Sequence, residues 1–311
     1  MTPARRALAR DPAAAGRRMD AAGPPNRAPV RPNAMTVDVE EHFQVSAMET
    51  VVRRGDWDRH PSRVEANVDW LLDRFAEHGI AATFFTLGWI AERHGAMIRR
   101  IVAAGHELAS HGYAHVRVNT QDPAAFRADV RRAKAVLEDA GGVSVRGYRA
   151  ASFSIDASTP WAHAVLAETG HAYSSSVYPI RHDHYGMPSA PRFAYAPLPG
   201  SGFREIPLST AEVMGRRVPC AGGGYFRLLP LPVSAAAIDR LNRREGARCV
   251  FYLHPWEIDP GQPRVPGLSG RTRFRHYVNL SRTAPRLTHL LRRYPWGPMN
   301  RAFPEIAEAT T

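Results

Sequence analysis

Cysteine and lysine are almost absent from the 311-residue sequence. Only Cys220 and Cys249 occur, without a Cys-x-x-Cys pair, so we expect buried free thiols and neither a disulfide framework nor a thiolate metal site. No apolar run reaches the roughly 20 residues that a membrane-spanning helix needs. The N-terminal residues also lack the unbroken apolar stretch of a secretory signal. The sequence therefore predicts a cytoplasmic protein with no stable membrane insertion.

Positive charge is abundant but carries no nucleic-acid signature. The net charge is +12, and Lys134 is the single lysine, so arginine supplies nearly all of the basic charge. The arginines are spread along the chain, and no basic stripe with interleaved stacking aromatics is present, which argues against a nucleic-acid partner. An anionic polymer remains a candidate partner, because net positive charge steers its approach.

The N-terminal segment differs in composition from the rest of the chain. Residues 1–34 are rich in Ala, Pro and Arg, hold +5 of the net charge and show no apolar periodicity. We expect this segment to be disordered. From Met35 onward the pattern is that of a folded protein, and we expect one domain over residues 35–299 and a short tail over residues 300–311.

Short apolar strands alternate with helices in the predicted domain, and Ser62 with Glu65 forms a predicted capping box at the start of the first helix. The expected strands are 35–43, 81–87, 106–109, 145–153, 173–178 and 248–253, and the expected helices are 62–79, 90–104, 122–141, 159–168, 233–245 and 283–293. This alternation predicts a parallel α/β fold, a β/α barrel of about seven units. The Pro- and Gly-rich stretch around 181–224 is expected to be an irregular insertion, with a hairpin near 204–208.

Two histidines lie four residues apart in His111-Gly112-Tyr113-Ala114-His115. At this spacing two imidazoles can reach one metal ion, although a chain with 14 histidines also contains such pairs by chance. Gly112 follows the first histidine, so the helical zinc-protease motif His-Glu-x-x-His is not present. Two imidazoles and one carboxylate would form a three-ligand site for zinc or another divalent first-row ion, with positions left for water and substrate.

Other polar residues follow the ends of the expected strands. Asp38, Glu40, Arg149, Ser174 and His254 fall at or just beyond such ends, which face one mouth in a β/α barrel. Each alone could be a solvated acid, an ion-pair partner or a packed core residue, but their coincidence predicts a site. Asp38 could take a proton from a metal-activated water, and His254 could protonate a leaving group.

Five motifs give the sequence a specific resemblance to a known family. They are Thr36-Val37-Asp38-Val39-Glu40-Glu41, Ser110-His111-Gly112-Tyr113-Ala114-His115, Gly147-Tyr148-Arg149-Ala150-Ala151-Ser152-Phe153, Gly222-Gly223-Gly224-Tyr225-Phe226-Arg227 and Tyr252-Leu253-His254-Pro255-Trp256-Glu257. With these motifs the chain resembles the NodB-homology polysaccharide deacetylases, most closely the branch found with exosortase-linked exopolysaccharide loci. The resemblance extends from about Met35 to Met299.

The resemblance implies a distorted barrel that acts as a metal-dependent hydrolase. The implied activity removes N-acetyl groups from N-acetylhexosamine units of an exopolysaccharide or its precursor. The implied cofactor is a divalent metal ion, zinc first, with Co, Ni, Mn or Fe as alternatives. By resemblance, Asp38 is the catalytic base, Arg149 holds the base, and His254 is the general acid. His111 and His115 are the implied metal ligands.

The third metal ligand departs from the family pattern. The family usually has two adjacent acids in its first motif, whereas Val39 follows Asp38 in this chain. We expect Glu40 to be the third ligand, because it lies two residues on and on the same side of a strand. Glu41, which would point the other way, is the alternative.

Two further departures concern activity. Ala151 replaces the family's common proline, and Ser174 stands where relatives carry an aspartate that tunes the general-acid histidine. A neutral serine cannot raise the pKa of a histidine by charge pairing. Either another acid, such as Glu257 or Asp183, substitutes, or activity is reduced. The second case defines an alternative function, a catalytically impaired glycan-binding protein with the same pocket.

Aromatic and histidine side chains near the mouth are candidates for substrate contact, and we expect Tyr225, Trp256 and His182 to bind the polysaccharide. His182-Asp183-His184 also has the composition of a second metal cluster, which we interpret as a chance pattern. A third hypothesis is an anionic-polymer or nucleic-acid binder that uses the arginines of residues 1–34.

Overall fold

The computed structural model describes residues 31–306, and their core is a parallel sheet. Its strands are β1 (Asn33–Val39), β2 (Thr83–Thr86), β3 (Glu107–Ser110), β4 (Gly147–Tyr148), β5 (Tyr173–Ser174), β6 (Arg204–Glu205), β9 (Val250–Leu253) and β10 (Trp296–Gly297). Neighbours follow the order β1-β2-β3-β4-β5-β6, and β1 also pairs with β9 and β10. Every one of these pairs is parallel, as the alternating pattern predicts.

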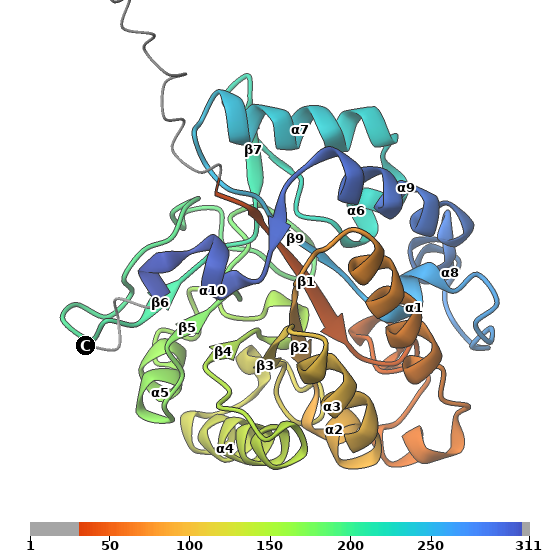
Figure 1. Cartoon of the computed structure of the whole chain (residues 1–311). Helices are drawn as coiled ribbons and strands as arrows, with labels where there is room; N and C mark the ends of the chain where they lie inside the picture. The colour runs from red at the N-terminus through yellow and green to blue at the C-terminus, as the bar shows by residue number, and fades with distance from the viewer. Residues whose placement is uncertain (1–30, 307–311) are drawn as a thin grey trace, which may run out of the picture. The chain divides into compact units, whose positions relative to one another are not determined.

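Helices surround this sheet, with α1 to α5 outside β1 to β5 and with α7 and α9 beside β9 (Figure 1). The helices are α1 (Val64–Glu77), α2 (Gly88–Arg93), α3 (Gly95–Ala103), α4 (Pro123–Gly141), α5 (Ala162–Glu168), α6 (Gly223–Leu228), α7 (Leu231–Arg243), α8 (Gly270–Tyr277), α9 (Leu280–Arg293) and α10 (Met299–Ala302). Short 3-10 segments are η1 (Ser46–Met48), η2 (Arg54–Arg59), η3 (Val118–Thr120), η4 (Ala151–Phe153), η5 (Pro255–Ile258) and η6 (Pro304–Ile306).

Strand β1 divides its side chains between two environments. Met35, Val37 and Val39 are buried in the main apolar cluster, together with the inward face of α1. Because side chains alternate along a strand, Thr36 and Asp38 point to the opposite side, and both are fully buried there. One face of β1 therefore packs into the apolar core, and the opposite face carries the buried polar side chains of Thr36 and Asp38.

The sheet is a half-barrel whose open side is covered by an irregular segment. No strand pair joins β6 to β9 among residues 31–306. Instead, the chain after β6 runs past Ser209, whose Oγ accepts a hydrogen bond from Val250 N, and Ala221, whose carbonyl accepts one from Tyr252 N. The predicted barrel-like α/β architecture is thus confirmed, but seven regular closed units do not form.

The expected insertion around 181–224 contains an antiparallel hairpin of β7 (Thr210–Val213) and β8 (Arg216–Pro219). Near 204–208, where the sequence predicts a hairpin, antiparallel pairing is limited to an isolated bridge between Tyr195 and Glu205. Arg204 and Glu205 instead form β6, which pairs in parallel with β5. The local sequence showed a strand-like run but could not show which distant strand it pairs with.

The ends of the described chain are well packed. Strand β1 begins at Asn33, whose Oδ1 accepts a hydrogen bond from Cys249 N, so the folded part starts before Met35. Met299 and Ala302 of α10 are both buried. Met299 is the last residue of the expected domain, whereas Ala302 lies in the expected tail, so the packed part of the chain extends past residue 299. The expectations for residues 1–30 and 307–311 lie outside the described residues.

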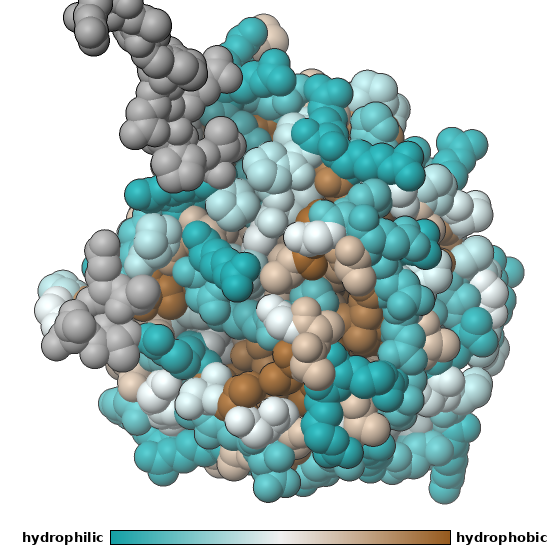
Figure 2. Space-filling model, viewed as in Figure 1, coloured by the Kyte–Doolittle hydropathy of each residue, from teal (hydrophilic) through white to brown (hydrophobic). Residues whose placement is uncertain are grey.

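Both cysteines are free and buried, as expected. Within residues 31–306, no helix combines the length and apolar character needed to cross a membrane. On the face of the molecule in Figure 2, hydrophilic residues cover most of the surface, and hydrophobic residues appear in smaller patches between them.

Candidate metal centre and active site

The strand register brings the polar residues of four motifs to one end of the sheet. Val39, Thr86, Ser110, Tyr148 and Ser174 are neighbours in one row across β1 to β5. The residues that follow this row include Glu40, His111, Arg149 and Ser175. On the other side of β1, Val37 pairs with Leu253, so His254 begins the next turn beside Asp38. The sheet itself therefore assembles the predicted site.

Glu40, His111 and His115 form the one group of three potential metal ligands found among residues 31–306. One donor atom from each lies within 4.8 Å of the others, and all three side chains are buried. Glu40 Oε2 lies 2.9 Å from His115 Nε2. Two imidazoles and a carboxylate at this separation could hold one divalent ion.

The Glu41 carboxylate caps the N-terminus of α1 instead of joining the three potential ligands. Its Oε1 accepts hydrogen bonds from Arg63 N at 2.8 Å and Val64 N at 3.0 Å, and from the hydroxyl of Ser62. The carboxylate thus satisfies free amides at the start of α1. The predicted capping box of Ser62 and Glu65 is wrong, because Glu41, 22 residues before Arg63, caps the helix. The geometry favours Glu40 over Glu41 as third ligand.

His111 is held by the backbone of the next strand. Its Nδ1 lies 2.8 Å from the carbonyl oxygen of Arg149, which fixes the ring and leaves Nε2 for a ligand. Burial lowers the pKa of His111 to about 4, so the imidazole is neutral near pH 7. Gly112 has φ of 77°, and a Cβ there would lie 3.0 Å from Asp129 Oδ2. The turn after the first histidine therefore requires glycine.

The second histidine has an unusual backbone held by an arginine from a distant loop. His115 has φ of 51°, a conformation that costs energy for a residue with a Cβ. Arg54 donates hydrogen bonds to the carbonyls of Ala114 at 2.8 Å and His115 at 3.1 Å, and to Glu49 Oε1 at 3.0 Å. Sequence analysis missed Arg54, because it belongs to no motif and lies in a loop without periodicity.

The Glu40 carboxylate is ionised in its buried position. Burial alone would raise its pKa, but the charge and hydrogen bond of His115, followed by the charges of His254 and His111, lower the pKa to about 2. Trp256 Nε1 also donates a 3.4 Å hydrogen bond to Glu40 Oε1. A buried anion surrounded by imidazoles is the expected environment of a cation-binding carboxylate.

Asp38 is paired with a completely buried arginine. Arg149 Nη1 donates hydrogen bonds of 2.7 Å to both Asp38 Oδ1 and Thr36 Oγ1. The remaining donors of Arg149 reach Ser175, with Nε at 3.1 Å from its carbonyl and Nη2 at 3.0 Å from its hydroxyl. The guanidinium lies 4.1 Å from the centre of the Phe85 ring. With this many contacts, Arg149 can hold Asp38 in one orientation.

His254 lies between two carboxylates and is the most exposed member of the group. Its Nε2 is 3.4 Å from Glu40 Oε1, and its Nδ1 is 3.6 Å from Glu257 Oε2. Burial alone would lower the pKa of His254, but the adjacent Glu257 carboxylate and the charges of Glu40 and Asp38 raise it to about 9. Glu257 is itself held by Arg227 Nε at 2.9 Å.

The serine at position 174 brings no charge to His254, but a carboxylate from another position lies beside that histidine. Of the two acids considered as substitutes, Glu257 faces His254, whereas Asp183 is exposed and pairs with Arg271 and Arg275. Ser174 is buried and donates to Ser176 Oγ at 2.7 Å. Ala151, the other departure, is buried in the short segment η4.

The three residues expected to bind the polysaccharide, Tyr225, Trp256 and His182, lie in different environments. Trp256 is 5% exposed, and His254 and His276 stack on its ring at 5.1 Å and 4.4 Å, so its ring offers little free surface to a sugar. His182 is partly exposed and stacks on Tyr185 at 4.0 Å, with Tyr225 edge-on at 6.3 Å. A metal cluster at His182-Asp183-His184 is not found among the described residues.

Comparison with family models divides the chain into two matched parts. Residues 56–173 match the model described as polysaccharide deacetylase, and residues 175–304 match a domain of unknown function, DUF3473. Asp38 and Glu40 precede both matched ranges. His111, His115 and Arg149 fall in the first, and His254 falls in the second.

Curated relatives match over part of their length. A chitooligosaccharide deacetylase of Bradyrhizobium sp. (strain ANU 289) is 30% identical over 108 residues, 35% of this chain and 47% of that protein. One of Sinorhizobium fredii is 38% identical over 104 residues, 31% of this chain and 46% of that protein. A peptidoglycan-N-acetylglucosamine deacetylase of Bacillus cereus is 28% identical over 79 residues, 25% of this chain and 29% of that protein. The matches span about half or less of these relatives.

A solved structure shares the fold. A Mycobacterium smegmatis protein described as a polysaccharide deacetylase superposes with a TM-score of 0.51 and 22% identity, over 86% of this chain and 92% of that one. At this identity the match supports the architecture alone.

Proposed function

We propose that this chain, of which residues 56–173 match the polysaccharide deacetylase model, is a metal-dependent hydrolase that removes N-acetyl groups from N-acetylhexosamine units of a polysaccharide. The observation that carries the proposal is the convergence of Glu40, His111 and His115 next to the Asp38–Arg149 pair and His254. The names of the relatives support an N-acetylated glycan as substrate, and an exopolysaccharide or its precursor is the form that we propose.

The donor set fits a divalent first-row ion. Neutral imidazole nitrogens and one carboxylate oxygen are ligands of zinc, and Co, Ni, Mn and Fe accept the same set. Such an ion, when bound, polarises the amide carbonyl and lowers the pKa of a coordinated water. Only three protein ligands converge, which suits a catalytic site more than a closed structural one.

The protein's own residues handle the protons. Asp38, oriented by Arg149, takes the proton of the attacking water as general base. His254, whose pKa of about 9 keeps it protonated near neutral pH, gives its proton to the departing amine nitrogen. One water is consumed, the C–N bond of the acetamide breaks, and acetate and a free amine are released.

A first experiment joins metal content to activity. Purified protein is analysed for bound metal, and acetate release is measured on N-acetylated oligosaccharides before and after metal removal. The variants His111→Ala and His115→Ala are expected to lose both bound metal and acetate release. His289→Ala, at an exposed position on α9, is the matched control and should retain both. Undiminished activity in metal-free protein would exclude the proposal.

The catalytically impaired glycan-binding protein is the second candidate. This candidate follows from Ser174, which replaces an aspartate of the family. The contact between Glu257 and His254 makes it less favoured, because it places a carboxylate from another position beside the histidine. The two candidates differ in one measurement. Binding of oligosaccharide without any acetate release, in protein loaded with metal, would favour the binding protein.

A further inference from the structure

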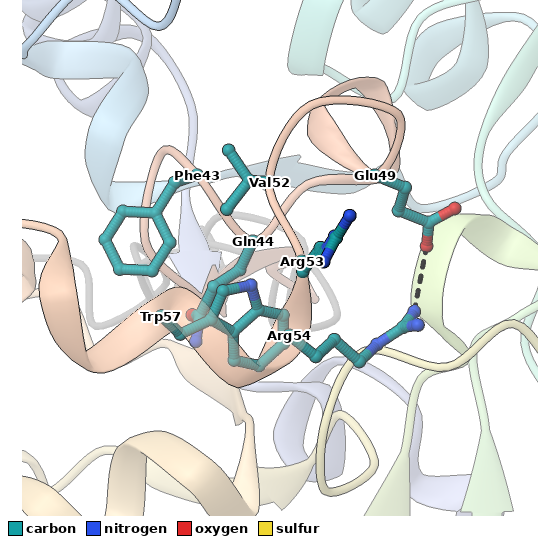
Figure 3. A pocket seen from close by; sticks show the side chains of 7 residues that line it. All are labelled: Phe43, Gln44, Glu49, Val52, Arg53, Arg54 and Trp57. Atoms are coloured by element: carbon teal, nitrogen blue, oxygen red, sulfur yellow. Dashed lines mark hydrogen bonds and ion pairs between the residues drawn. The ribbon is translucent and has the colours of Figure 1, made fainter.

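A hollow of about 250 Å³ lies in the loop that follows the candidate metal ligand Glu40. It is lined by side chains from one short stretch of chain: Phe43, Gln44, Glu49, Val52, Arg53, Arg54 and Trp57. Figure 3 shows Phe43, Val52 and Trp57 on one side and the polar groups of Arg53, Arg54 and Glu49 on the other.

The loop borders the candidate active site at two places. Ser46 Oγ lies 2.5 Å from Ser152 Oγ, three residues after Arg149. Arg54, which lines the hollow, donates to the carbonyls of Ala114 and His115. A polymer with one unit at the metal centre would therefore pass close to this loop with a neighbouring unit.

The lining is chemically suited to a sugar. Phe43, Val52 and Trp57 form an apolar floor that is only 2%, 6% and 3% exposed, so a ligand in the hollow would meet mainly the polar side chains around it. Gln44 is buried, and its Nε2 has no hydrogen-bond partner among residues 31–306. A buried amide donor without a partner costs free energy, and a ligand hydroxyl or carboxylate in the hollow could satisfy it.

The side chains that line the hollow carry a net positive charge, from Arg53 and Arg54 against Glu49. Glu49 is neutralised twice, by Arg54 at 3.0 Å and by Arg117 at 2.8 Å. Arg53 is exposed, and within the described part of the chain its guanidinium makes no hydrogen bond or ion pair (Figure 3). An acidic group on the ligand would give this cation a partner, whereas a neutral sugar would not.

We propose that this hollow is a subsite for an acidic sugar unit adjacent to the deacetylated one, with Arg53 as the residue that recognises the carboxylate. The inference rests on the proposed function and narrows its substrate to an anionic N-acetylated polysaccharide. The overall charge of +12 acts in the same direction, since it attracts a polyanion from solution.

The test uses hyaluronan oligosaccharides, in which a uronic acid alternates with N-acetylglucosamine, and the same oligosaccharides with methyl-esterified carboxyl groups. Binding is measured by calorimetry and acetate release by kinetics. The native protein is expected to bind the acidic form more tightly than the ester. In Arg53→Gln this preference should fall about fivefold, as expected for loss of one partly exposed ion pair. Arg59→Gln, in the same loop and 81% exposed, should keep the preference.

The outcomes separate the two proposals. Equal binding of acid and ester by the native protein, or an unchanged preference in Arg53→Gln, would overturn the subsite. A salt-sensitive preference that Arg59→Gln loses equally would also overturn it, because the effect would then be general attraction. Absence of acetate release with an intact, Arg53-dependent preference would instead contradict the hydrolase and leave the subsite established by binding.

Discussion

Arg149 and Asp38 form a fully buried ion pair, with Nη1 2.7 Å from Oδ1. The same arginine accepts a hydrogen bond from the His111 ring through its backbone carbonyl. One residue thus positions the candidate base with its side chain and a candidate metal ligand with its main chain. A disturbance at Arg149 should affect both.

The first prediction concerns this pair. Arg149→Met should destabilise the fold by about 3–5 kcal/mol, because it leaves the buried Asp38 carboxylate without its partner. The double variant Asp38→Asn/Arg149→Met should recover part of the loss, since the uncompensated charge is then absent. Urea unfolding followed by fluorescence measures both. A loss below about 1 kcal/mol in the single variant, typical of exposed pairs, would contradict the assignment.

The second prediction distinguishes the two adjacent glutamates. Glu40→Gln should weaken metal binding by more than the roughly 10–100-fold typical of an outer-shell change, because it removes a charged ligand. Glu41→Gln should leave metal binding within about twofold and lower the stability by about 1 kcal/mol, because α1 loses the negative charge at its N-terminus. Competition with a chromogenic chelator gives the affinities. The reverse pattern would make Glu41 the ligand.

Much of the site followed from the sequence, for reasons that individual residues make clear. Strand alternation placed Asp38 and Glu40 on one side, and both point away from the apolar cluster that contains Val37. The histidine pair gained meaning from residues at the ends of other strands, which parallel pairing necessarily brings together.

Long-range pairings were beyond sequence reasoning. Ser62 had the local pattern of a capping box, but the cap of α1 comes from Glu41. Trp256 had the composition of a sugar platform, but two imidazoles cover its faces. The closure of the half-barrel near Ala221 depends on a contact with Tyr252 that no local signal encodes. In each case the deciding partner lies far away in the chain.

The third prediction tests the arginine that holds the His115 turn. Arg54→Gln removes the donors to the Ala114 and His115 carbonyls, so the strained turn should loosen and metal affinity should fall about tenfold. Arg59→Gln, which removes an exposed arginine from the same loop, is the matched control. Equal affinities in the two variants would show that Arg54 does not position the ligand.

The fourth prediction concerns the serine at the family's usual aspartate position. Ser174 pairs in register with Glu205, which is completely buried and accepts hydrogen bonds from Ser176 N and Val177 N at 2.9 Å. Ser174→Asp would place a second carboxylate beside it, and the stability should fall by about 3 kcal/mol or more. No gain in acetate release is expected. An active, stable Ser174→Asp protein would show that the position still serves His254.

The last prediction is a pH profile. His254 must be protonated to act as general acid. Without metal its pKa is raised to about 9, in part by the charge of Glu40, and a bound cation offsets that charge, so the alkaline decline of acetate release should lie at or below about pH 9. Glu257→Gln removes one of the negative charges that raise this pKa. The alkaline limb of the profile should therefore move to lower pH, with little change in activity on its acidic side.

Two controls are needed to interpret this pH profile. Glu168→Gln, at an exposed position on α5, should leave the alkaline limb where it is. Thermal unfolding of each variant across the same pH range separates loss of fold from loss of the proton, because Glu257 also holds Arg227. If Glu257→Gln is folded and keeps the alkaline limb of the native protein, then Glu257 does not set the protonation of His254 and does not substitute for the aspartate that Ser174 replaces.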